Sequence, residues 1–154
     1  MGQRYKKTVA ENRKARFDYH IFESIEAGIE LKGNEVKSLR MGRVNLRDSF
    51  ARIEGGQAVL YGMHITPYEF ARREEVSPLR TRRLLLNRAE IRRLAGKVMQ
   101  KGFVLVPLRV YFLGNYAKIE IGVAKGKKLF DKKEVIKKKD SDRDMERELV
   151  DRQK

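Results

Sequence analysis

The chain has 154 residues, no cysteine, two histidines and a formal net charge of +15 at neutral pH. Disulfides and thiolate-bound metals are therefore excluded, and no ligand-like spacing around His20 or His64 predicts a metal site. Because no apolar run approaches the roughly 20 residues of a membrane span and Met1 to Glu11 hold no apolar stretch, we expect a cytoplasmic protein without membrane contact or secretory signal.

The positive charge is spread along the whole chain rather than confined to one end. An excess of this size favours a polyanionic partner, and nucleic acid is the natural one. A basic protein with no nucleic-acid role is the alternative.

The first third of the chain predicts an arm, a strand and a helix. Residues 1–16 are polar and basic, so we expect an N-terminal arm. Apolar and polar residues alternate from Phe17 to Ser24, which predicts a strand that continues towards Leu31. Gly28 within this run indicates a bulge or a close backbone approach. A short helix is predicted over residues 34–41, with Asn34 as its N-cap and Gly42 as its end.

The middle of the chain predicts a hairpin and a long loop. Residues 49–53 and 57–63 flank Gly55-Gly56, a pair that supplies the positive φ angles of a tight turn. Residues 66–79 contain two prolines and several charged residues, which is typical of a loop that is functional or flexible.

The last third predicts a helix and two strands. Asn87 and Glu90 have the spacing of a capping box, and the helix that follows is expected to end at Gly102. Residues 103–113 and 116–124 are predicted to be strands joined by Gly114-Asn115. The first contains Pro107, which indicates an edge strand or a bulge. Its apolar residues at alternate positions are expected to share one face: Val104, Val106, Leu108, Val110 and Phe112.

These elements give a mainly β fold with about six strands, antiparallel hairpins and two or three short flanking helices. A small closed antiparallel β-barrel is the most economical arrangement, and OB-like barrels are among the candidates. We expect the barrel over residues 17–128. Residues 129–154 lack glycine and proline and are dominated by charge, so we expect a flexible tail that is disordered alone and helical when bound to a polyanion. A merely solubilising tail is the alternative.

No nucleophile elbow, phosphate loop, dinucleotide fingerprint or zinc motif is present, so we expect a protein without enzymatic activity or cofactor. Basic residues cluster at residues 12–16, 80–83 and 125–128, and the small residues Ala15, Gly122 and Gly126 are expected to leave room for a phosphate backbone. Tyrosines such as Tyr61 and Tyr111 alternate with apolar residues and are expected in the core more than stacked on bases. The RNA-binding candidates in the first and third clusters are Arg13, Lys14, Arg16, Gly122, Lys125, Lys127 and Lys128.

Several blocks together resemble the small protein B, or SsrA-binding protein, family of bacterial trans-translation. They run in order along nearly the whole chain: Asn12-Arg-Lys-Ala-Arg16, Glu26-Ala-Gly28, Glu35-Val-Lys-Ser-Leu-Arg40, His64-Ile-Thr-Pro67, Arg80-Thr-Arg-Arg-Leu-Leu-Leu-Asn87, and Lys118-Ile-Glu-Ile-Gly-Val-Ala-Lys-Gly-Lys-Lys128 with Asp131-Lys132.

The resemblance implies an OB-type barrel that binds the elbow of the tRNA-like domain of transfer-messenger RNA and delivers that RNA to stalled ribosomes. Family residues linked to RNA binding fall on Glu26, Leu85 and Lys118. The resemblance also implies a monomer, one copy per RNA, whose barrel stands in for the anticodon arm and whose tail senses the empty mRNA channel. Candidate sensing residues in that tail are Asp131, Lys132, Lys133, Lys137 and Lys138.

Two other classes fit a basic chain of this kind. A structural ribosomal or ribosome-assembly protein would carry the same charge, and a nuclease would need clustered carboxylates to hold a divalent metal. The sequence offers no such cluster.

Overall fold

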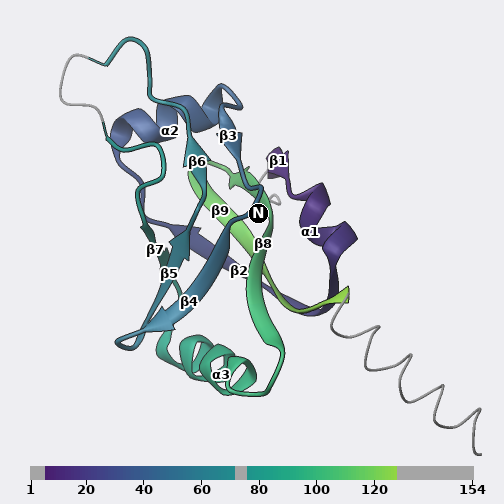
Figure 1. The fold of residues 1–154 in the computed structure, drawn as a ribbon. Coiled ribbons are helices and arrows are strands. Elements are labelled where there is room, and N and C mark those ends of the chain that lie inside the picture. Colours follow the sequence, from purple (N-terminus) through teal and green to yellow (C-terminus); the bar gives the residue numbers. More distant parts are fainter. Residues whose placement is uncertain (1–5, 72–75, 128–154) are drawn as a thin grey trace, which may run out of the picture.

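The computed structural model describes residues 6–71 and 76–127 (Figure 1). Lys128 and the predicted tail over residues 129–154 lie outside the described residues. The elements in chain order are β1 Lys6–Glu11, α1 Arg13–Asp18, β2 Tyr19–Ile29, α2 Gly33–Arg40, β3 Val44–Asn45, β4 Phe50–Glu54, β5 Gln57–Tyr61, β6 His64–Ile65, β7 Arg82–Leu85, α3 Arg88–Val98, β8 Phe103–Leu113 and β9 Tyr116–Gly126.

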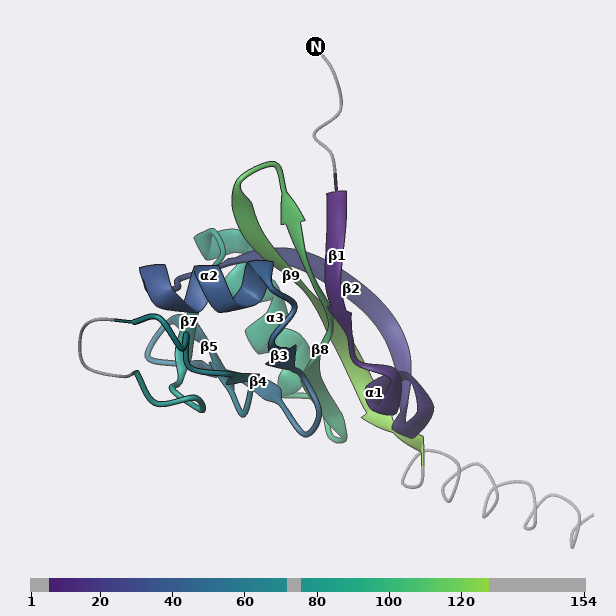
Figure 2. The same ribbon diagram turned by 90° about the horizontal axis from the view of Figure 1, so that it is seen from above.

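Six antiparallel strands form a closed ring in the order β8-β4-β5-β7-β2-β9, because β8 and β9 also pair with each other. The predicted mainly β, closed antiparallel barrel is therefore confirmed. Strand β1 pairs with β8 outside the ring, as Figure 2 shows. In Figure 1, α2 and α3 lie at opposite ends of the barrel, and α1 lies beside its outer wall. Within the described part of the chain, no helix is long and apolar enough to cross a membrane.

The core fills the ring and has a small satellite outside it. Alternate residues of the strands point inward and are almost completely buried, among them Ala27, Leu84, Leu105, Ile119 and Ile121. A second buried cluster lies on the outer wall beneath α1 and consists of Ala15, Val106, Leu108 and Ala124. The satellite attaches α1 to the barrel, since burial of apolar surface on the outer wall stabilises this contact.

An irregularity in β8 reverses the faces of that strand. Pro107 pairs with Ile121 and Arg109 with Glu120, so one residue of β8 is left over between them. That residue is Leu108, which lies with Val106 in the outer cluster. Leu105 before it and Val110 and Phe112 after it face the core, so the alternation shifts by one residue. The prediction of a bulge at Pro107 is confirmed. The predictions of an edge strand and of a single apolar face are wrong, because β8 is paired on both sides and an extra residue switches the alternation.

The N-terminal region differs from the sequence prediction. The part of the arm that the structure describes contains β1 and α1, and β2 begins at Tyr19 rather than Phe17. The physical reason is Asn12, whose side chain is buried. Its Oδ1 accepts from the Ala15 N–H at 3.1 Å, while its Nδ2 donates to the Leu46 and Pro107 carbonyls at 3.2 and 2.9 Å.

Local signals in the rest of the chain are largely confirmed. Gly55 and Gly56 both have positive φ in the β4–β5 turn. The capping box of α3 is complete, since Glu90 N–H donates to the Asn87 side chain and Asn87 N–H donates to that of Glu90. Helix α2 begins at Gly33, one residue before the predicted range, and its N-cap is Lys32, two residues before the predicted Asn34. Strand β7 was not predicted and closes the ring between β5 and β2.

Candidate nucleic-acid interface

Three residues lie side by side across β7, β2 and β9 on the outer wall of the barrel. Gly28 pairs with Leu85 on one side and with Lys118 on the other. We call Leu85, Gly28 and Lys118 the outer row. Gly28 is buried, whereas Leu85 is 50% exposed and lies over it. The row borders a groove that Leu31 and Tyr116 also line. Two of the residues that the resemblance singles out, Leu85 and Lys118, are thus brought to one place.

The third, Glu26, lies on the same wall two residues before Gly28. It is exposed and stands directly opposite Glu120 in the β2–β9 pair. Like charges directly opposite each other destabilise a sheet. Glu120 is compensated by Arg109, whose Nε lies 2.9 Å from its Oε2, and by Arg16, whose Nη2 lies 3.8 Å from its Oε1.

Glu26 is held by a different kind of partner. The buried hydroxyl of Tyr111, on β8, donates a hydrogen bond to its Oε1. Burial and this contact with the Glu26 carboxylate raise the pKa of the Tyr111 hydroxyl well above its usual range. Tyr111 therefore keeps its proton, and remains a donor, at every pH at which a protein normally works.

Positive charge surrounds this tyrosine. The Lys6 ammonium lies 4.1 Å from the centroid of the Tyr111 ring, and the guanidinium carbon of Arg109 lies 5.3 Å from it. Neither residue was a candidate in the sequence, because only the pairing of β1 with β8 and the bulge in β8 bring both to this wall. The outer wall therefore presents an oriented carboxylate among cations.

The predicted cluster on α1 is placed by Asn12 but is only partly free. Arg13 is exposed. Lys14 Nζ lies 2.8 Å from Asp48 Oδ1, and Arg16 is paired with Glu120. Both ion pairs are partly exposed, so each holds its cation only weakly. Lys14 and Arg16 can exchange these partners for phosphates.

The predicted cluster at the end of β9 lies against aromatic rings. Lys125 Nζ lies 4.5 Å from the Phe103 ring centroid, and Lys127 Nζ lies 5.8 Å from that of Phe17. Contrary to the prediction, Gly122 does not leave room for an RNA backbone. A Cβ there would lie 3.0 Å from Leu108 Cδ1, so this glycine accommodates the outer cluster of the chain itself.

The basic run at residues 80–83 is mostly not a surface patch. Strand β7 alternates, so Arg82 points inward and is 1% exposed while Arg83 is exposed. Arg82 Nε donates to Glu35 Oε2 at 2.7 Å and its Nη1 to the Met63 carbonyl at 2.6 Å; Arg80 binds the other oxygen of Glu35. Burial raises the pKa of Glu35, but hydrogen bonds from Arg80, Lys32 N–H and Arg82 together lower it below the ordinary value.

Other predicted residues cannot be placed. Lys128 and the tail candidates Asp131, Lys132, Lys133, Lys137 and Lys138 lie outside the described residues. Within residues 6–71 and 76–127, no group of three His, Cys, Asp or Glu side chains is arranged to hold a metal ion.

A small closed barrel with a net positive charge and an outer wall of this kind defines a nucleic-acid-binding protein. The family model described as SmpB protein matches residues 9–151, and the chain belongs to this family.

Curated relatives and a solved structure agree with this assignment. An SsrA-binding protein of Carboxydothermus hydrogenoformans is 61% identical over 143 residues, which cover 93% of this chain and 96% of the relative. One of Geobacillus thermodenitrificans is 53% identical over 148 residues, which cover 96% of each chain. A solved structure described as "tmRNA-SmpB: a journey to the center of the bacterial ribosome" matches with a TM-score of 0.66 and 55% identity, over 77% of this chain and 83% of that one.

Proposed function

We propose that this chain binds transfer-messenger RNA (tmRNA, SsrA RNA) and acts with it in trans-translation on the bacterial ribosome. The single observation that carries this function is membership of the SmpB family over nearly the full chain, at 61% identity to a protein named SsrA-binding protein. The net charge of +15 supports it, because an RNA partner is a polyanion. The function is recognition of RNA and not catalysis.

The barrel is the docking unit of this proposal. Leu85 supplies an apolar contact, Lys118 and the basic residues of α1 and the β9 end supply phosphate contacts, and Glu26 supplies a hydrogen-bond acceptor. All are presented by strands or by a helix anchored to them, so the contacts are held on a rigid scaffold. Such a surface recognises the shape of a folded RNA rather than a linear sequence, which suits the elbow of a tRNA-like domain.

The second unit is the charged tail over residues 129–154, which lies outside the described residues. In this proposal the barrel replaces the missing anticodon arm and the tail senses whether mRNA fills the channel of the ribosome. Its acid–base alternation allows helical i,i+4 pairs such as Glu134–Lys138 once a polyanionic channel compensates the cost of ordering. One copy of the protein acts on each RNA.

A competition experiment tests the docking unit. The full chain is bound to labelled tmRNA and challenged with unlabelled tmRNA or with a generic RNA duplex of equal length, at fixed salt. We expect tmRNA to compete far better. Equal competition by the duplex would reduce the protein to a general polyanion binder and overturn the proposal.

A truncation after Phe130 tests the tail separately. It should retain affinity for tmRNA and lose peptide tagging on stalled ribosomes in a reconstituted translation system. Tagging at the level of the full chain would refute the sensing role while leaving the docking role intact.

A further inference from the structure

The contact between Tyr111 and Glu26 has features that the rest of the wall lacks. Tyr111 is 1% exposed, yet its hydroxyl reaches the outer wall and binds an exposed carboxylate. The two residues stand on β8 and β2, with β9 between them, so the hydrogen bond crosses a whole strand. Figure 1 shows these three strands adjacent to one another in the barrel.

The two carboxylates of this wall are treated differently. Glu120 is bound by two arginines, whereas Glu26, directly opposite, receives a neutral hydroxyl. Among the residues that the structure describes, no lysine or arginine is paired with Glu26. Glu26 therefore stands opposite a second carboxylate without a paired cation from the described residues, an arrangement that stability alone disfavours. A binding role explains why such a charge stands on a basic surface.

The hydrogen bond also gives the two oxygens of the Glu26 carboxylate different roles. Tyr111 donates to Oε1, which fixes the plane of the group and leaves Oε2 with its lone pairs available. An acceptor fixed in this way recognises N–H or O–H donors without an added cost of ordering on binding. RNA offers such donors as base amino groups and 2′-hydroxyls.

We infer that Tyr111 is a positioning residue: its hydroxyl orients the Glu26 carboxylate so that the free oxygen accepts a hydrogen bond from the bound RNA. This inference rests on the proposed function and adds a residue that itself lies beneath the surface and touches no RNA. The hydroxyl carries the role, and the ring serves as packing between Lys6, Arg109 and the strands.

The variant Tyr111→Phe isolates the hydroxyl, because it keeps the ring and its contacts. We expect its affinity for tmRNA to fall about tenfold, the effect of losing one well-placed hydrogen bond to a charged group. The slope of affinity against salt should stay unchanged, since no phosphate contact is lost.

A double-mutant cycle separates positioning from a general structural effect. The cycle uses Tyr111→Phe, Glu26→Ala and the double variant. If Tyr111 acts through Glu26, then Tyr111→Phe has no further effect on affinity in the Glu26→Ala background. Equal losses in both backgrounds would overturn the inference, as would a single variant that binds like wild type. Thermal unfolding of each variant shows whether affinity and stability change together, the result expected of packing alone.

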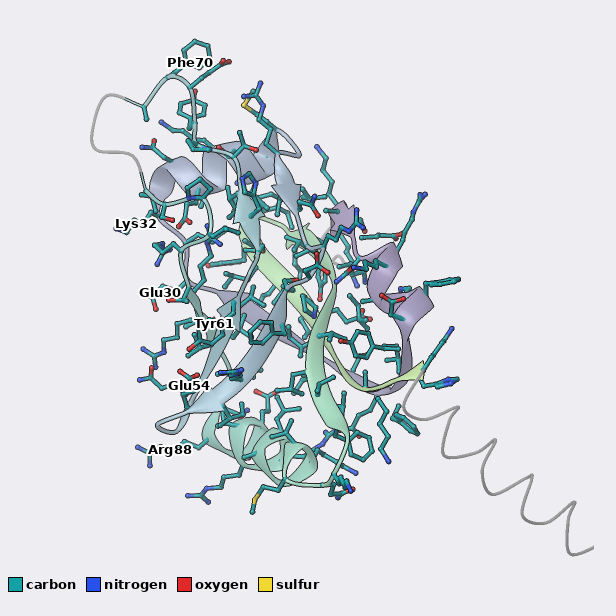
Figure 3. The ribbon with its side chains drawn as sticks, in the orientation of Figure 1. Glu30, Lys32, Glu54, Tyr61, Phe70 and Arg88 are labelled. Atoms are coloured by element: carbon teal, nitrogen blue, oxygen red, sulfur yellow. The ribbon has the colours of Figure 1, made fainter. Side chains whose placement is uncertain are left out.

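The chain contains a matched control. Tyr61 Oη lies 2.6 Å from Glu54 Oε2, a second tyrosine–glutamate hydrogen bond on the β4–β5 hairpin, where Figure 3 labels both residues. Tyr61→Phe should leave tmRNA affinity unchanged. The outcomes also distinguish the two proposals: if wild type prefers tmRNA over a duplex while Tyr111→Phe is neutral, the positioning role alone fails. If wild type shows no such preference, the proposed function fails.

Discussion

Leu85 lies directly over the backbone of Gly28, the residue with which it pairs across β7 and β2. A Cβ placed on Gly28 would lie 3.2 Å from Leu85 Cβ and 3.4 Å from Leu85 Cδ1. Because Gly28 has no side chain, Leu85 can pack directly against the backbone of β2. The position of Leu85 relative to Lys118, which pairs with Gly28 on the other side, therefore depends on this glycine. The prediction of a close backbone approach at Gly28 is confirmed, and the partner is a residue of the chain itself.

Gly28→Ala should therefore lift Leu85 by a few tenths of an ångström and weaken tmRNA binding several-fold. The φ angle of Gly28 is not in the left-handed region, so alanine fits the backbone, and the loss of unfolding free energy should stay below about 2 kcal/mol. Equilibrium binding and chemical denaturation measure the two effects. Gly96→Ala on α3, where nothing lies within 4 Å of an added Cβ, is the control. This variant should bind RNA like wild type, and its unfolding free energy should rise by up to about 1 kcal/mol. Normal RNA binding by Gly28→Ala would show that the height of Leu85 does not matter.

Lys118→Ala should weaken tmRNA binding and reduce its salt dependence. A lysine that neutralises one phosphate contributes about 0.7–0.9 to the slope of log affinity against log salt concentration. Affinity is measured over a salt series for wild type, Lys118→Ala and Arg92→Ala, the last removing an exposed cation from α3. The Arg92 variant should keep the wild-type slope. An unchanged slope for Lys118→Ala would remove this residue from the phosphate contacts.

Asn12→Ala should destabilise the fold by about 1–3 kcal/mol, because it removes the N-cap of α1 and leaves the Leu46 and Pro107 carbonyls without the amide donor. Helix α1 carries Arg13, Lys14 and Arg16, so RNA affinity should fall as well. Denaturant unfolding measures the stability. Arg13→Ala, at the next and exposed position, should affect affinity alone. Unchanged stability in Asn12→Ala would show that α1 holds its place by the outer cluster without the cap.

Glu35→Gln should make stability at low pH less dependent on pH. The pKa of Glu35 is lower in the folded than in the unfolded state, so its stabilisation is complete above about pH 4.5 and is lost as pH falls through the folded value. At neutral pH, the unfolding free energy of the variant should be about 3 kcal/mol lower than that of wild type, because Arg82 would be left buried without its counter-charge. Urea unfolding between pH 3 and 7 should show that the difference in unfolding free energy between wild type and variant becomes smaller as the pH falls. A gap that is constant across this range would contradict the lowered pKa.

The sequence predicts best those features whose partners are near in the chain. The capping box joins residues three apart, and the glycine turn of the β4–β5 hairpin is local as well. Asn12 shows the opposite case, since its side chain binds carbonyls 34 and 95 residues away. A polar residue before a basic run carries no sign of such partners, so the sequence predicts an arm where the structure has α1.

The candidate site follows the same rule. Glu26, Leu85 and Lys118 could be named by resemblance, but their arrangement depends on strand pairing. The sequence predicts a surface cation at Arg82, because its partner Glu35 is 47 residues away. Tyr111 is buried as predicted, but its hydrogen bond to Glu26, 85 residues away, has no local signal in the sequence. Contacts of this kind depend on the strand register of the barrel, and no local sequence pattern predicts that register.

The closure of the ring by β9 also has a consequence for the synthesis of the protein. Strand β2 pairs with β9, the last element of the barrel to leave the ribosome, and the outer row exists only when that pair has formed. A nascent chain that ends before Lys118 has Gly28 and Leu85 but no third member of the row, and the hydrogen bonds of β2 on that side have no partner strand. Because this pairing joins residues far apart in the sequence, the outer row is complete only after β9 has been synthesised.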